Sequence, residues 1–170
     1  MARLYVCSLT KVVDTVRASG ARSLVTILTA GASLVRPNEI APERHLRLAV
    51  SDIDATRDGH VLASCEHIES LLAFADAWDR REPLVIHCYA GVSRSPAAAF
   101  ILACALAPQR SECELARELR RASPTATPNR RLVALADKIL ARDGRMSEAI
   151  AGIGRGADCY EGAPFALELA

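Results

Sequence analysis

Residues 85–96 read VIHCYAGVSRSP, and the predicted fold of the chain is built outward from this stretch. It follows Pro83 and a short apolar run at residues 84–86, and it leads into the alanine-rich residues 97–103. Branched aliphatic side chains favour β-strands, whereas alanine and leucine favour helices. The stretch therefore predicts a strand, a tight loop and the first turn of a helix.

The loop is predicted to bind an oxyanion. The first N–H groups of a helix lack partners within the helix and carry a partial positive charge, so a loop wrapped around them attracts anions. Pro96 is tolerated early in the helix because its missing donor is not needed there. Ala90 and Gly91 are small enough to let backbone amides approach a guest. The predicted phosphate-binding residues are Tyr89, Ala90, Gly91, Val92, Ser93 and Arg94.

Four side chains of this stretch point to nucleophilic chemistry. The helix N-terminus and a neighbouring cation favour Cys88 as a thiolate at neutral pH. Arg94 carries a planar fork of donors that matches two phosphoryl oxygens. Ser95 can donate to the sulfur and so favour the thiolate as a leaving group, and His87 is expected to orient the loop. A cysteine alone at a strand end is more often a small buried hydrophobe, so the prediction depends on the combination.

From His87-Cys88 to Arg94-Ser95, the stretch resembles the signature loop of the protein tyrosine phosphatase superfamily, in its compact dual-specificity-like, bacterial-type branch. The resemblance implies that Cys88 is the nucleophile, Arg94 the phosphate clamp and Ser95 the helper of the thiolate. It also implies a phosphoric monoester hydrolase that acts on phosphotyrosine, or more widely on phosphoserine and phosphothreonine, through a phosphocysteine. Cofactors are not expected.

The resemblance extends to two further elements. One is the pair Pro128-Asn129, for which it implies that Asn129 braces the signature loop; the alternative is a plain helix cap. The other is a general acid upstream. Asp52 is the first choice because it directly follows a predicted strand at residues 46–50, Asp54 is the alternative, and Asp58 reads better as part of a turn with Gly59. Asp52 precedes Cys88 by 36 residues, and an insertion near residues 57–60 would explain this rather long separation.

Composition indicates a modest globular enzyme. The chain has 170 residues, enough for one domain with a single core, and 51% are hydrophobic but only 4% aromatic. The formal net charge of +1 gives no reason to expect nucleic acid or membranes as partners. No apolar run reaches the roughly 18 residues needed to span a bilayer, and residues 1–6 read as a strand rather than a signal sequence. A cytoplasmic location is expected.

Metal sites and structural disulfides are not expected. The four histidines form no cluster, and the six cysteines lack the paired spacing of metal ligands. Residues 152–156 are rich in glycine, but no predicted strand precedes them, so dinucleotide binding is not expected. The cysteines are Cys7, Cys65, Cys88, Cys104, Cys113 and Cys159.

Hydrophobic periodicity extends the prediction to the whole chain. Strands are predicted at residues 4–7 and 24–28 with a helix between them, followed by a long amphipathic helix from Val61 to Trp78, whose indole is expected to pack in the core. Further helices are predicted at 112–121 and 130–141. The fold class is α/β, with a mostly parallel central sheet flanked by helices. Residues 1–170 are predicted to be one phosphatase domain, with 145–170 as an extension packed on it; its candidate anchors are Phe165, Leu167 and Leu169.

Other functions stay open at this stage. A rhodanese-like sulfurtransferase also cradles an anion with a cysteine loop, and a catalytically weak phosphoprotein-binding module would keep the pocket without turnover. Relatives that act on phosphoinositides carry lysines in the loop, whereas residues 89–93 are uncharged here, which disfavours polyphosphorylated lipid headgroups. The expected partner is a phosphoprotein or a small phosphomonoester. The sequence indicates no oligomeric state.

Overall fold

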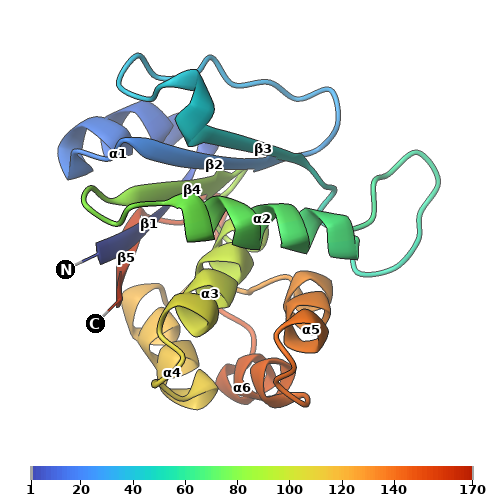
Figure 1. The fold of residues 1–170 in the computed structure, drawn as a ribbon. Coiled ribbons are helices and arrows are strands. Elements are labelled where there is room, and N and C mark those ends of the chain that lie inside the picture. Colours follow the sequence, from blue (N-terminus) through green and yellow to red (C-terminus); the bar gives the residue numbers. More distant parts are fainter. Residues whose placement is uncertain (1, 170) are drawn as a thin grey trace.

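The computed structural model describes residues 2–169. Its centre is a five-stranded sheet with the order β3-β2-β4-β1-β5 (Figure 1). The first four strands in this order are parallel to their neighbours, and β5 runs antiparallel to β1. This confirms the predicted α/β class with a mostly parallel sheet. The strands are β1 (Ala2–Ser8), β2 (Ser23–Leu28), β3 (His45–Ala49), β4 (Leu84–Cys88) and β5 (Phe165–Leu169).

Helices cover both faces of the sheet because its strands are buried on both sides. Successive residues of a strand point to opposite faces, and so Leu24 joins the smaller buried cluster under α1 (Val12–Ser19), while Val25 joins the larger one under α2 (Cys65–Ala77) and α3 (Arg94–Leu106). The remaining helices pack around α3 on the side of the larger cluster (Figure 1). They are α4 (Glu112–Ala122), α5 (Arg130–Ile139) and α6 (Arg145–Ile153).

The central helix α3 begins at the point where the sheet ends. Its residues 94–104 are all buried, as expected for a helix that is apolar on every side. Only residues 89–93 separate it from β4, and so the N-terminus of α3 lies beside the carboxyl end of the parallel strands. Ligand sites of open parallel sheets lie at this end.

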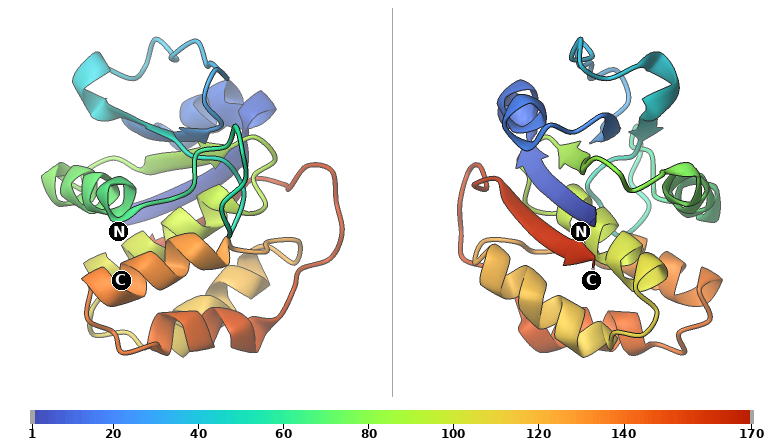
Figure 2. Two further views of the ribbon diagram at one scale, coloured as in Figure 1. Left: turned by 90° about the vertical axis from the view of Figure 1, so that its right-hand side faces the viewer. Right: turned by 60° about the vertical axis from the view of Figure 1, so that its left-hand side comes forward.

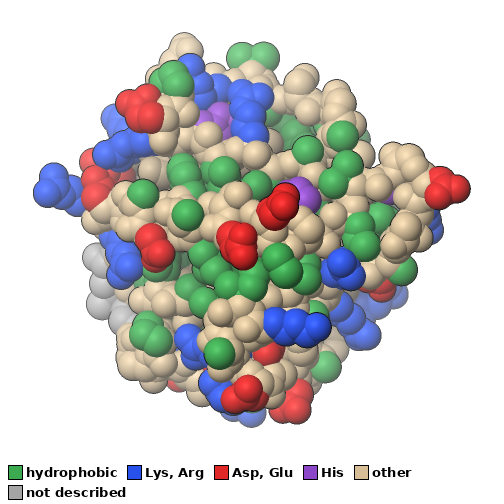
Figure 3. Space-filling view, turned by 45° about the vertical axis from the view of Figure 1, so that its right-hand side comes forward, with side chains coloured by type: hydrophobic (Ala, Val, Ile, Leu, Met, Phe, Trp, Pro, Cys, Tyr) green, Lys and Arg blue, Asp and Glu red, His purple; other side chains and the backbone are tan. Residues whose placement is uncertain are grey.

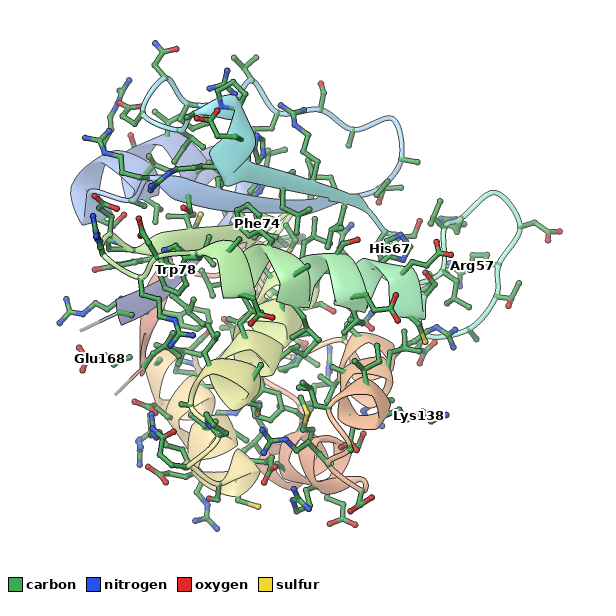
Figure 4. All side chains as sticks on the ribbon, in the orientation of Figure 1. Arg57, His67, Phe74, Trp78, Lys138 and Glu168 are labelled. Atoms are coloured by element: carbon green, nitrogen blue, oxygen red, sulfur yellow. The ribbon has the colours of Figure 1, made fainter. Side chains whose placement is uncertain are left out.

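Helix α2 is shorter than predicted. It begins at Cys65 rather than Val61, because Ser64 caps it and donates its backbone N–H to His67 Nδ1 over 3.0 Å. Val61 instead closes a loop, since the backbone N–H of Ser51 donates to the Val61 carbonyl at 2.9 Å and the Val61 N–H donates to Ser51 Oγ at 3.1 Å. Figure 4 shows that this loop, which carries Arg57, extends away from the body of the protein.

Two details of the prediction for this region agree with the structure. Asp58 and Gly59 form a turn, with Gly59 at a φ of +76°. Trp78 lies at the end of α2 and is 6% exposed within the larger buried cluster, so it packs in the core as expected (Figure 4).

The segment predicted as an extension contributes to the sheet itself. Phe165 and Leu167 are buried, and β5 pairs with β1 along its length. Helix α6 was not predicted, because a side chain of the preceding helix caps it: the buried Asp137 carboxylate accepts from the backbone N–H groups of Gly144, Met146 and Ser147. Between α6 and β5, residues 154–164 run along the outside of the molecule (Figure 2). We call these residues the strap.

The surface carries charges of both signs. Figure 3 shows Lys and Arg side chains interspersed with Asp and Glu on the face in view, in keeping with a formal net charge of +1. None of the helices within residues 2–169 is both long enough and apolar enough to cross a membrane.

Candidate active site

The signature loop, residues 88–94, is held from outside by hydrogen bonds. Several of its backbone carbonyl groups point outward and accept from N–H groups of other segments. Because the C=O of one residue and the N–H of the next point in opposite directions across a planar peptide, the following N–H groups face the space that the loop encloses. The N-terminus of α3 adds its partial positive charge at the same place. In each of these bonds a backbone N–H donates to a loop carbonyl: that of Leu9 donates to the Tyr89 carbonyl (3.0 Å), that of Gly162 to Ala90 (2.8 Å), that of Thr127 to Val92 (2.7 Å) and that of Asn129 to Ser93 (3.2 Å).

Gly91 allows the loop to lie directly against the end of β1. Its φ is +71°, a conformation that side-chain-bearing residues rarely adopt. A Cβ atom at this position would lie 2.9 Å from both the Cys7 carbonyl carbon and the Ser8 nitrogen, which are backbone atoms. Both the backbone conformation and the available space therefore require glycine here.

The structure brings Cys88 and Ser95 together on the inner side of the loop. Cys88 ends β4 and is 2% exposed, and its Sγ lies 3.0 Å from Ser95 Oγ in the first turn of α3. Ser95 itself is fully buried. The hydroxyl is thus in a position to donate to a thiolate, which is the geometry that the sequence predicted.

Arg94 is buried, and its buried Nε lacks an acceptor among residues 2–169. Its Nη1 donates to the Val50 carbonyl over 2.8 Å and to Thr29 Oγ1 over 3.3 Å. An unsatisfied buried donor costs about 1–3 kcal/mol of folding free energy. An anionic acceptor in the loop would remove this cost.

Asp52 lies beside the signature loop and is hydrogen-bonded both to the loop and to Asn129. Its Oδ1 accepts from Ser93 Oγ at 2.7 Å and from Asn129 Nδ2 at 3.0 Å, while the residue stays exposed to solvent. Asp54 borders the same surface depression of about 310 Å³. Of the three candidate aspartates, Asp52 alone is hydrogen-bonded to the signature loop within residues 2–169.

Asn129 combines the two roles that the sequence left open. Its Oδ1 accepts from the backbone N–H of Leu132 at 3.1 Å and so caps α5. Its backbone N–H holds the Ser93 carbonyl, and its Nδ2 holds Asp52. The residue therefore connects the signature loop, the aspartate and the start of α5.

The strap supplies contacts that sequence reasoning missed. Gly162 donates to the Ala90 carbonyl, and a Cβ atom on Gly162 would lie 3.0 Å from the Gly91 carbonyl oxygen. The neighbouring Glu161 carboxylate accepts from the hydroxyls of Ser8 and Thr10, which lower the pKa of Glu161. No local signal marks these residues, because about seventy positions separate the strap from the loop that it supports.

Burial sets the protonation of the neighbouring groups. It lowers the pKa of His87 to about 4, so the ring is neutral at pH 7, and it raises the pKa of Cys7 and of Cys104 to about 12. These two thiols therefore stay protonated. All six cysteines are free. No group of three or more histidine, cysteine or acidic side chains is arranged to hold a metal ion anywhere in residues 2–169.

Comparisons with known proteins agree on the fold. No family model and no curated protein matches this sequence. Among solved structures, human DUSP28 is 18% identical, with a TM-score of 0.60 over 88% of this chain and 94% of that one. The PTP-2 phosphatase of Cydia pomonella is 19% identical, with a TM-score of 0.61 over 79% and 84%. The human tyrosine phosphatase-like serine/threonine/tyrosine-interacting protein is 15% identical, with a TM-score of 0.62 over 82% and 92%.

These likenesses define the class of fold. The chain has the dual-specificity-like fold of the protein tyrosine phosphatase superfamily, as its signature loop predicted. Its particular activity has to be inferred from the site, since sequence identities of 15–19% to these three structures establish the fold alone.

Replacing Gly91 by alanine should weaken oxyanion binding by tenfold or more, because the added methyl group would push the loop off the backbone of β1. A tenfold loss of affinity corresponds to about 1.4 kcal/mol of binding free energy. Vanadate or phosphate affinity, measured by calorimetry, checks this. Gly20→Ala is the matched control, because Gly20 has the same φ of +71° but nothing within 4 Å of its added Cβ. Equal losses in the two variants would show that backbone strain alone is responsible.

Proposed function

We propose that the protein is a cysteine-dependent phosphatase that hydrolyses phosphate monoesters through a phosphocysteine. One observation carries the proposal: the Cys88 sulfur, 3.0 Å from the Ser95 hydroxyl, shares its loop with a buried arginine whose Nε has no acceptor among residues 2–169. A phosphoryl group in the loop would give that Nε an acceptor and would meet the inward N–H groups. It would also lie next to the sulfur.

In the first step, the Cys88 thiolate attacks phosphorus as the bond to the ester oxygen breaks. An S–P bond forms, and the electron pair of the broken P–O bond goes to the leaving oxygen. Asp52 supplies the proton that this oxygen needs. Both hydrogen bonds to Asp52 use Oδ1, so Oδ2 is the oxygen that would carry the proton. Arg94 and the loop amides stabilise the charge on the phosphoryl oxygens.

In the second step, water attacks the phosphocysteine. Its oxygen forms a bond to phosphorus, its proton goes to the Asp52 carboxylate, and the S–P bond breaks. Ser95 is placed to donate to the departing sulfur, which favours the thiolate as a leaving group. Both steps use only residues of this chain and water.

The substrate range that we propose is phosphotyrosine, extended to phosphoserine and phosphothreonine. Residues 89–93 carry no charge, so nothing within the loop pairs with extra phosphates. The depression beside Asp52 is a surface feature that would accommodate residues flanking a phosphorylated side chain. Phosphoproteins and small phosphomonoesters both fit this description.

A phosphoprotein-binding module without turnover is the second candidate. It is favoured by one neighbour in fold, which is named as a phosphatase-like interacting protein. The presence of Cys88, Arg94, Ser95 and Asp52 in one site supports the enzyme instead. The phosphatase fold likewise disfavours a rhodanese-like sulfurtransferase.

Cys88→Ser should reduce hydrolysis of an aryl phosphate to background and should keep the affinity for inorganic phosphate within a few fold, because the loop amides and Arg94 remain. Acid-quenched wild-type enzyme should carry a phosphoryl group on Cys88 in peptide mass spectra. A reduced wild-type protein that binds vanadate but does not hydrolyse the ester would favour the binding module.

Asp52→Asn should slow turnover by about 10²–10⁴-fold for a phosphate ester of a poor leaving group such as an alkyl alcohol, the usual effect of losing a general acid. Esters of acidic phenols should be affected much less, since their leaving oxygen needs little protonation. Asp54→Asn is the matched control. The assignment of the acid moves to Asp54 if that variant alone shows the loss.

Phosphopeptides should be better substrates than inositol polyphosphates by kcat/KM, because the loop has no lysine to pair with additional phosphates. Parallel kinetics on phosphotyrosine, phosphoserine and phosphothreonine peptides of one sequence would rank the three residues. Faster turnover of an inositol polyphosphate than of every peptide would contradict the proposed range.

A further inference from the structure

A chain of three hydrogen bonds crosses the sheet to the reactive cysteine, and its direction follows from the chemistry of its members. The buried His87 ring has its Nδ1 3.2 Å from the Cys88 carbonyl oxygen. A carbonyl only accepts, so Nδ1 carries the ring proton. Because the ring is neutral, its Nε2 is an acceptor.

Thr26 on β2 is the next member. Its hydroxyl lies 2.8 Å from His87 Nε2, which it must therefore supply with a proton. The same oxygen lies 2.7 Å from Nε2 of His45 on β3, which can only be the donor in that bond. The chain thus runs from the His45 N–H to the Thr26 oxygen, from the Thr26 O–H to His87, and from the His87 N–H to the Cys88 carbonyl. We call it the histidine relay.

The surroundings keep the relay in this one arrangement. Thr26 and His87 are buried, and His45 is half-buried at the start of β3. Burial, with the nearby charges of Arg47 and Arg36 and the ring of His87, lowers the pKa of His45 to about 4. Both rings are therefore neutral at pH 7. Two further ionisable groups lie near the far end of the relay. The charge of Arg94 helps to lower the pKa of His87, and the charge on Cys88 helps to raise the pKa of Cys7.

The last bond of the relay acts on the first peptide of the signature loop. The Cys88 carbonyl and the Tyr89 N–H belong to one planar group and point in opposite directions. Holding the carbonyl against His87 therefore aims the first N–H of the loop away from the ring and toward the enclosed space. An N–H directed there stabilises negative charge on the sulfur or on a bound phosphoryl group.

We infer that Thr26 and His45 are positioning residues for the signature loop, which act through His87 to orient the Cys88–Tyr89 peptide and so stabilise negative charge on the reacting sulfur or phosphoryl group. This inference rests on the proposed function in so far as Cys88 is the reactive group. A role limited to satisfying buried polar atoms would stabilise the fold but leave the reactivity of Cys88 unchanged.

Thr26→Val keeps the shape of the side chain and removes the hydroxyl, so His87 Nε2 loses its donor. The rate of iodoacetamide alkylation at Cys88, measured at pH 6 by peptide-resolved mass spectrometry, should fall about three- to tenfold, the size of one hydrogen bond. Thr26→Ser keeps the hydroxyl and should restore the rate to within twofold. The exposed Cys65, Cys113 and Cys159 are internal references whose rates should not change.

His45→Gln and His45→Phe form a second pair at a half-buried position, where replacement endangers folding less. Glutamine keeps an N–H donor and should react like wild type, whereas phenylalanine should show part of the loss seen with Thr26→Val. Nitrogen chemical shifts of His87 should report a protonated Nδ1 in wild type, and the Nε2 shift should change in Thr26→Val because this nitrogen loses its hydrogen bond.

The outcomes separate the relay from the proposed function. Fast alkylation of Cys88 in wild type that is unchanged in Thr26→Val would overturn the relay and leave the phosphatase intact. Wild-type Cys88 reacting no faster at pH 6 than the exposed reference cysteines would instead count against the proposed function. Equal losses in Thr26→Val and Thr26→Ser would also overturn the relay, because the hydroxyl would then not be the cause.

Discussion

The arrangement of the site follows from the way its loop is held: donors from outside residues 88–94 hold the carbonyl groups of Cys88, Tyr89, Ala90, Val92 and Ser93. His87, Leu9, Gly162, Thr127 and Asn129 supply these donors. A short loop without such support would turn its carbonyls toward water or toward its own centre, and negative charge would then be repelled. Because peptides are planar, bonds on the outside determine which groups line the inside. The direction in which the loop's N–H groups point is therefore a consequence of the packing around it.

The signature loop and the segment that carries Asp52 are held by shared hydrogen bonds. Arg94 donates to the carbonyl of Val50, two residues before Asp52, and Ser93 of the loop donates to Asp52 itself. Asn129 holds both the loop and the aspartate while it caps α5. A displacement of the aspartate loop would thus disturb the arginine as well. This explains how an exposed carboxylate keeps a defined position beside the signature loop.

Much of the site could be predicted from one local stretch, because a strand, a loop and a helix start are encoded by neighbouring residues. The contact of Cys88 with Ser95 and the approach of Asp52 follow from that stretch and from the strand before Asp52. The helix expected from Val61 was wrong at its start, since Val61 pairs with Ser51 across a loop. Helix α6 and strand β5 were not predicted. Helix α6 is capped by Asp137 of α5, and β5 is held by its pairing with β1, so both depend on contacts between elements.

From the amino-acid sequence alone, the parallel α/β class and the strand-to-helix turn could be predicted, and Cys88 and Arg94 could be proposed as nucleophile and clamp. Local propensity and the spacing of a few reactive side chains suffice for these features. Only the tertiary structure decided which distant segments hold the loop: the strap through Gly162, the end of β1 against Gly91, and the relay through Thr26. Hydrogen bonds between residues far apart in the chain leave no periodic trace in sequence, because any residue offers the same backbone donor.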